Sequence, residues 1–114
     1  MKLIHSYRFG EVVVEGDRFT TDITITADGS VSGWRRREGH VLSMEDLKGV
    51  LSNGLEVLVV GTGNSGAMSV PDELGRCLGK LGIELIAQRT ESACETYNRL
   101  LGQKKVAAAL HLTC

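Results

Sequence analysis

Residues 55–66, LEVLVVGTGNSG, indicate the fold more clearly than any other part of the chain. Residues 55–60 are nearly all apolar and β-branched, which is typical of a strand covered on both faces. A glycine-rich loop follows, and a proline then opens a helix over residues 71–81 whose leucines share one stripe. A buried strand, a loop and an amphipathic helix in succession predict an α/β fold.

The alternation of strands and helices continues toward the C-terminus. Residues 83–87 form the next predicted strand, and the apolar residues 106–112 form a further buried strand. Between them, Ser92 and Glu95 have the spacing of a capping box, which predicts a helix over residues 92–102. This half of the chain therefore predicts a β-α-β-α-β arrangement in which helices cover a central sheet.

The N-terminal third has the alternation of a β-meander instead. Residues 12–14 form a short predicted strand, and residues 21–27 alternate polar and apolar side chains. The dipeptide Asp28-Gly29 is a strong hairpin signal that links this second strand to a third over residues 30–36.

One further helix is predicted between the two halves, over residues 43–51. Ser43 stands three residues before Asp46 at its expected start, in the pattern of a helix N-terminus. No linker, repeat or low-complexity segment divides the sequence. Residues 1–114 are therefore predicted to form one α/β domain, with an N-terminal β-meander and a central sheet flanked by helices.

The composition argues against several classes of partner. The formal net charge is −1 with acidic and basic residues mixed, so we expect neither nucleic acid nor an anionic membrane surface as a partner. The run Arg35-Arg36-Arg37 is interpreted as the solvated face of a strand. The three cysteines form no disulfide framework, and no leader or bilayer-length apolar segment is visible. We therefore expect reduced thiols and a cytoplasmic location.

Residues 61–66 match the dinucleotide-binding fingerprint G-x-G-x-x-G after a buried strand. In that fingerprint the helix begins inside the loop, whereas Pro71 marks a later start here. Gln88 and Arg89 also occupy the region where a ribose-binding acid is expected, so no cofactor is predicted. The loop predicts either a tight turn that requires positive φ angles or a set of N–H groups that bind an anion.

Two polar clusters are further candidates for a site. Arg37, Glu38 and His40 lie where the last hairpin strand leaves the sheet, and this set can bind an anion or move a proton. The alternative is a surface turn with a local ion pair. On the last helix, Tyr97 is consistent with packing, whereas the adjacent Asn98 is expected to cap, turn or bind something.

Neither a metal centre nor a catalytic set of residues is predicted. If the last strand runs to the end of the chain, His111 and Cys114 point to opposite faces and cannot share a metal. Cys77 and Cys94 have apolar neighbours on helices and are interpreted as small core residues.

Several segments together resemble the Mth-type domain family. In chain order they are Trp34, Arg37, Glu38 and His40; residues 58–63; Val70 and Pro71; Gly82 and Ile83; Thr90, Ala93, Tyr97 and Asn98; and His111, Thr113 and Cys114. That family contains small archaeal and bacterial proteins of unknown function and an adipogenesis-associated vertebrate protein, with a mitochondrial complex I assembly factor as a more distant relative. The resemblance implies a three-layer fold with a mixed central sheet and no established reaction. It also implies a final strand antiparallel to the others, which would place His111 opposite residues 61–66.

These observations leave three hypotheses about function. The leading one is a non-catalytic binding or assembly module with an unidentified protein partner, which follows from the resemblance and from the lack of a catalytic set. The second is an enzyme or sensor that binds a small molecule or a small anionic ligand through Arg37, Glu38 and His40. The third is a nucleotide-binding protein that uses the glycine loop. The sequence predicts no oligomeric state.

The candidate surface lies beyond the carboxyl ends of the predicted parallel strands, where ligands bind in open α/β sheets. Its residues are Gly61, Gly63, Asn64 and Ser65 in the loop, Tyr97 and Asn98 on the last helix, and Arg37 and His40 at the rim.

Overall fold

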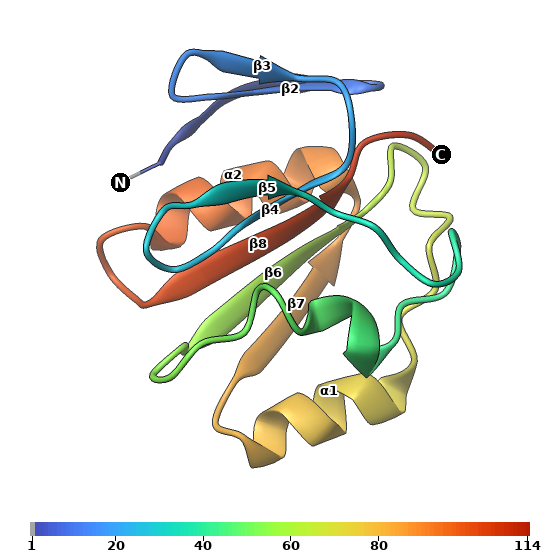
Figure 1. Ribbon diagram of the computed structural model, residues 1–114, viewed down its shortest axis with the longest axis vertical. Coiled ribbons are helices and arrows are strands. Elements are labelled where there is room, and N and C mark those ends of the chain that lie inside the picture. The colour runs from blue at the N-terminus through green and yellow to red at the C-terminus, as the bar shows by residue number, and fades with distance from the viewer. Residues whose placement is uncertain (1) are drawn as a thin grey trace.

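The computed structural model describes residues 2–114 and contains two β-sheets (Figure 1). In chain order the elements are β1 (Ile4–Arg8), β2 (Glu11–Val14), β3 (Asp17–Phe19), β4 (Ile23–Ile25), β5 (Val31–Gly33), the short 3₁₀ helix η1 (Met44–Leu47), β6 (Val57–Thr62), α1 (Asp72–Lys80), β7 (Glu84–Gln88), α2 (Thr90–Leu100) and β8 (Val106–His111). Figure 1 shows the smaller sheet, β1-β2-β3, lying over α2 at one end of the molecule.

The larger sheet has the strand order β5-β4-β8-β6-β7. Its strands β7, β6 and β8 are parallel to one another, whereas β4 pairs antiparallel with β8 and with β5. The sheet is therefore mixed. The prediction of an α/β fold with a mixed central sheet, flanking helices and an N-terminal β-meander is confirmed.

The direction of the last strand differs from the expectation. β8 runs parallel to β6, with His111 directly opposite Thr62, so the implied antiparallel direction is wrong. The connection from β7 through α2 to β8 is a β-α-β crossover, and such a crossover returns the chain to the same edge of the sheet in the same direction. His111 consequently lies beside the start of the glycine loop instead of at the opposite edge.

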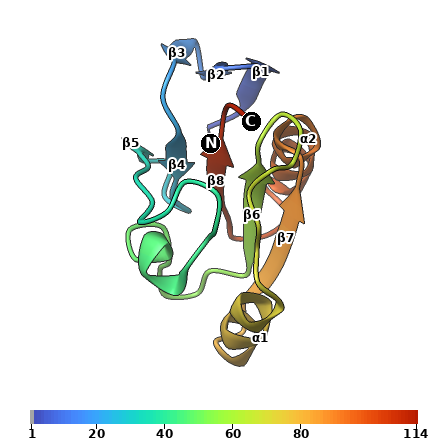
Figure 2. The ribbon, with the colours of Figure 1, turned by 90° about the vertical axis from the view of Figure 1, so that its right-hand side faces the viewer.

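Strand β6 divides the core because its side chains alternate between the two faces of the sheet. Val57 and Val59 pack toward α2 and the small sheet, in a cluster that includes Tyr97. Leu58 and Val60 pack toward η1 and α1 on the other face. Figure 2 shows the sheet between α2 on one side and η1 on the other.

The helix expected over residues 43–51 is reduced to the single 3₁₀ turn η1. In an α-helix the carbonyl of Asp46 would accept a hydrogen bond from the N–H of Val50. Here that carbonyl accepts a hydrogen bond from the indole N–H of Trp34, at 2.9 Å, and the Val50 N–H donates to Leu47 instead. Burial of Trp34 therefore competes with the α-helical bond pattern.

Two other details also differ. Helix α2 begins at Thr90 with Arg89 as its N-cap residue, so Ser92 and Glu95 lie inside the helix and do not cap it. Cys77 is exposed on α1 because Leu74 and Leu78 occupy the buried stripe of that helix, so its placement in the core is wrong, whereas Cys94 is buried as expected. Within residues 2–114, no helix has the length and apolar character needed to cross a membrane.

Candidate functional site

The carboxyl end of β8 carries a buried ionic cluster that the sequence did not predict. The Asp22 carboxylate, just before β4, lies 2.8 Å from Nδ1 of His111 and accepts a hydrogen bond of 2.8 Å from the N–H of Leu112. Arg36 completes the cluster with a bond of 2.8 Å from Nη1 to the same carboxylate. The side chains of Arg36 and His111 are only 6% and 7% exposed.

Arg36 is held by packing as well as by charge. Its guanidinium carbon lies 4.6 Å from the ring centroid of Trp34, and Nη2 donates to the carbonyl of Gly39 at 3.2 Å. The interpretation of residues 35–37 as a solvated face is therefore wrong for the central arginine. By binding Gly39, Arg36 also fixes the loop that presents His40.

The surroundings of Asp22 keep its carboxyl ionised. Burial alone would raise the pKa of Asp22, but hydrogen bonds from the Leu112 N–H, from His111 and from Arg36 outweigh burial and hold the pKa below its ordinary value. The cluster therefore pairs a permanent cation with an ionised carboxylate beside an imidazole.

The glycine loop closes on the C-terminal segment of the chain. The N–H of Asn64 donates to the carbonyl of Thr113 at 3.2 Å, and the N–H of Ser65 donates to the main-chain oxygen of Cys114 at 3.0 Å. The N–H of Gly63 donates to the Thr90 hydroxyl at 2.9 Å. These donors, which the sequence suggested for an anion, are thus occupied by groups of the protein itself.

Close packing explains why glycine stands at two loop positions. A Cβ at Gly63 would lie 2.6 Å from the Thr113 oxygen, and Gly63 has a φ of 110°. A Cβ at Gly61 would lie 2.8 Å from the Thr90 hydroxyl oxygen. The loop is a tight turn that lets the C-terminal segment approach.

The side chains of Asn64 and Ser65 also take part in the contact between the glycine loop and its neighbours. The Ser65 hydroxyl donates to the main-chain oxygen of Cys114, and Asn64 Oδ1 accepts a bond of 3.3 Å from the Tyr7 hydroxyl. That tyrosine hydroxyl also lies 3.0 Å from the carbonyl of Leu112. The N-terminal sheet, the loop and the C-terminal segment therefore meet at one place.

Tyr97 and Asn98 lie in the last turns of α2 and have structural roles. Tyr97 is a fully buried core residue, and burial raises the pKa of its hydroxyl to about 12. Asn98 clamps strand β1, because its Oδ1 accepts from the Ile4 N–H at 2.9 Å and its Nδ2 donates to the Ile4 carbonyl at 2.7 Å. The structure does not bring these two residues to the glycine loop's contact with residues 113–114.

Of the predicted rim residues, only His40 approaches this region. Its ring centroid lies 6.3 Å from that of His111. The Arg37 side chain is exposed and lies 3.8 Å from Glu45, not from Glu38, at the edge of a cavity of about 560 Å³. Glu45 and Asp46 line the same cavity as the arginines, so its charge is mixed.

A second depression, of about 340 Å³, lies between η1 and α1 and has predominantly apolar walls. Eight residues line it, and we call it the η1–α1 groove: Val41, Leu42, Ser43, Met44, Pro71, Glu73, Leu74 and Cys77. Among them, the large apolar side chains of Val41 and Met44 are exposed to solvent.

Comparison with known proteins identifies relatives along the whole chain. A family model described as "Protein of unknown function (DUF498/DUF598)" matches residues 4–111. The conserved hypothetical protein PH1505 from Pyrococcus horikoshii OT3 is 31% identical, with a TM-score of 0.82 over 97% of this chain and 98% of that one. The solved structure MT938 is 28% identical, with a TM-score of 0.83 over 100% of both chains. A Mth938-like domain from Bordetella pertussis is 24% identical and shares the fold, with a TM-score of 0.69 over 97% of this chain and 85% of that one. These matches confirm the resemblance to Mth-type domains.

Proposed function

The chain belongs to the family of proteins of unknown function DUF498/DUF598, and we propose that it acts as a non-catalytic binding module for a protein partner. The single observation that carries this proposal is the η1–α1 groove, an apolar depression in the surface. Met44, on one wall of the groove, is 37% exposed and Val41 is 41% exposed. Apolar side chains grouped around a groove are typical of protein-binding sites.

The walls of the groove suit an amphipathic helix. One wall is the helix α1, through Leu74 and Cys77, and the other is η1 with the chain that precedes it. A helical partner would lay its apolar face between these walls, as in helix-in-groove recognition. Glu73 at the rim favours basic residues flanking that apolar face.

The alternative of a nucleotide bound by the glycine loop has less support. The loop N–H groups of Gly63, Asn64 and Ser65 already donate to Thr90 and to residues 113–114. A phosphate could use them only by displacing those oxygens. A partner in the η1–α1 groove would require no such displacement.

Site-specific photocrosslinking tests the proposal. A photoreactive amino acid at Met44 is expected to yield one dominant crosslinked protein in cells that produce the full chain. The matched control places the same group at Leu81, which is 62% exposed at the end of α1 and does not line the groove. Leu81 is the more exposed side chain. Nonspecific hydrophobic association would therefore give at least as much crosslinking from position 81 as from position 44.

The captured protein is then purified and its affinity measured. Met44→Asp is expected to weaken binding by about tenfold or more, whereas Leu81→Asp should leave the Kd within about twofold. Equal crosslinking from both positions, or wild-type affinity of Met44→Asp, would refute the groove as the docking site.

A further inference from the structure

Outside the η1–α1 groove, the buried imidazole of His111 has one ring nitrogen without a hydrogen-bond partner among the described residues. His111 Nδ1 lies 2.8 Å from Asp22, but Nε2 is buried and has no hydrogen-bond partner within the described residues. An unpaired buried polar atom costs free energy, so it indicates a ligand or a proton partner at that position. The His111 side chain is 7% exposed, which makes solvent a poor substitute.

The tautomer of His111 follows from its neighbours. The Asp22 carboxylate can only accept at this distance, so Nδ1 carries the proton and donates to it. Arg36 Nη2, 3.1 Å from Nδ1, has its own acceptor in the Gly39 carbonyl. The lone pair of the neutral ring is therefore on Nε2. Histidines that bind a metal through one nitrogen are commonly oriented by a carboxylate at the other, as Asp22 orients His111 here.

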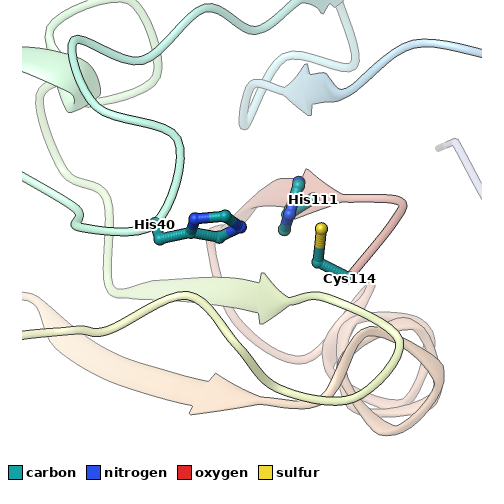
Figure 3. A group of neighbouring side chains, drawn as sticks. All are labelled: His40, His111 and Cys114. Atoms are coloured by element: carbon teal, nitrogen blue, oxygen red, sulfur yellow. The ribbon is translucent and has the colours of Figure 1, made fainter.

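Two more ligand-type side chains converge on the same place. His40, Cys114 and His111 each offer one nitrogen or sulfur atom, and these atoms all lie within 4.8 Å of one another. Figure 3 shows the His40 ring and the Cys114 sulfur both directed toward the His111 ring. From this convergence we propose that the protein binds a zinc ion through His40, His111 and Cys114.

The strand geometry that argued against such a site does not apply. β8 ends at His111, and the chain then turns, with Cys114 at a φ of 48°. The bonds from Asn64 and Ser65 to residues 113–114 hold this turn in place. Cys114 therefore lies on the same side as His111, and the glycine loop acts as the clamp that positions its thiol.

The types of ligand atom in the cluster indicate which metal ion it would bind. Two imidazoles and a thiolate suit Zn²⁺, whereas Mg²⁺ and Ca²⁺ require oxygen ligands. A tetrahedral zinc with bonds of about 2.0–2.3 Å spaces its ligand atoms about 3.3–3.6 Å apart, so the cluster must contract by about 1 Å. His40 and Cys114 are exposed and can make that movement, while His111 is fixed.

Three protein ligands leave a fourth position open. With the Cys114 thiolate, the ionised Asp22 and the Arg36 cation, a bound Zn²⁺ gives the cluster a net positive charge. A small anion such as hydroxide or chloride in the fourth position would offset that charge.

The test measures zinc binding by the full-length, untagged chain in competition with a chromophoric chelator. One equivalent of zinc is expected to bind. Loss of a ligand should cost more than loss of an outer-shell partner, so Cys114→Ser and His40→Gln should each weaken binding by about 100-fold or more, and Asp22→Asn, which removes the carboxylate that orients His111, by about 10–100-fold. Circular dichroism checks that the variants fold, which is expected because His40 and Cys114 are exposed.

Matched controls separate this site from adventitious surface binding. Cys77→Ser replaces another exposed cysteine, and His5→Gln replaces another exposed histidine, so both should bind zinc within about twofold of wild type. With Co²⁺ as a spectroscopic probe, a thiolate-to-metal charge-transfer band should appear, should be lost in Cys114→Ser and should be kept in Cys77→Ser. No zinc binding, equal losses in the control variants, or a thiolate band that survives in Cys114→Ser would overturn the proposal.

Discussion

Asp22 Oδ2 lies 2.8 Å from His111 Nδ1 although 89 residues separate the two in sequence. The contact joins the chain just before β4 to the carboxyl end of β8, and it exists because these two strands are antiparallel neighbours with Ile23 opposite Leu110. The buried ionic cluster is therefore a consequence of sheet order, and it ties the N-terminal part of the large sheet to its parallel half.

Asp22→Asn is expected to lower the free energy of unfolding at pH 7 by about 2–3 kcal/mol, because three charge-assisted hydrogen bonds onto the carboxylate are weakened. Burial opposes ionisation of Asp22, but bonds from Leu112, His111 and Arg36 outweigh it and lower the pKa of the folded protein. A carboxyl with a lowered folded pKa stabilises the protein above its unfolded pKa of about 3.9, and this contribution is lost as the pH falls through the folded pKa.

Urea unfolding of wild type and Asp22→Asn across the acid range measures this effect. The stability difference between the two proteins should be constant above about pH 5 and should shrink as the pH falls below about 4. A difference that persists undiminished at about pH 2 would show that the carboxylate charge is not its source.

Asn98→Ala is expected to cost about 1–3 kcal/mol, because it leaves the N–H and carbonyl of Ile4 without their partner on α2. The loss should be local, since Asn98 attaches β1 and the small sheet to the helix. Hydrogen exchange measured by mass spectrometry should become faster in β1, β2 and β3, while β6 and β8 keep their protection.

The neighbouring Arg99→Ala is the control for Asn98. Arg99 is exposed on the same helix, so its replacement should change stability by no more than about 0.5 kcal/mol. Faster exchange spread evenly over both sheets in Asn98→Ala would contradict the role of Asn98 as a local clamp.

The parallel half of the fold could be predicted because its signals are local. The apolar run of residues 55–60 lies within a few residues of β6, and Pro71 marks the residue before α1. The failed helix over residues 43–51 shows the limit, because the Asp46 carbonyl is taken by the distant Trp34 indole. The hydrophobic periodicity of residues 43–51 gives no sign of a hydrogen bond to a residue outside the segment.

The buried ionic cluster could not be predicted for the same kind of reason. No sequence motif connects Asp22, Arg36 and His111, which lie far apart in the chain. They come into contact only when β4 pairs with β8. His111 and Cys114 were visible as ligand-type residues, but an antiparallel last strand would have separated them from the glycine loop. The orientation of one strand thus decides whether these residues lie beside the glycine loop.

Gly63→Ala is expected to destabilise the protein by about 2–4 kcal/mol. The residue has a φ of 110°, and the new Cβ would meet the Thr113 oxygen at 2.6 Å, so strain and a steric clash act together. Gly79→Ala, in contrast, should stabilise by about 0.5–1 kcal/mol, because Gly79 lies within α1 and the added methyl group would meet nothing within 4 Å.

Thermal and urea unfolding of the two alanine variants gives this comparison directly. The two substitutions add the same methyl group, so opposite signs must come from the surroundings of each glycine. Similar stabilities for Gly63→Ala and wild type would mean that residues 113–114 move aside at little cost, and the glycine loop would then not be the clamp described above.

Cys94 should be the least reactive thiol of the chain. Burial, followed by the charges of Glu95 and Glu91, raises the pKa of Cys94 to about 12, so the thiol stays protonated at pH 8 and lacks the reactive thiolate. Cys77 and Cys114 are exposed. Iodoacetamide at pH 8, followed by peptide mass spectrometry, should label these two in the native protein and should reach Cys94 only after unfolding in urea.

Zinc provides an internal control for this labelling. If Cys114 is a zinc ligand, one equivalent of Zn²⁺ should slow the alkylation of Cys114 by about tenfold or more and leave Cys77 unchanged, because a coordinated thiolate is a poorer nucleophile. Cys94 should be unaffected in either condition, since its protection comes from burial in the core between α2 and the sheets. Rapid labelling of Cys94 in the native state would instead indicate that α2 and β1 separate readily, and it would count against the clamp assigned to Asn98.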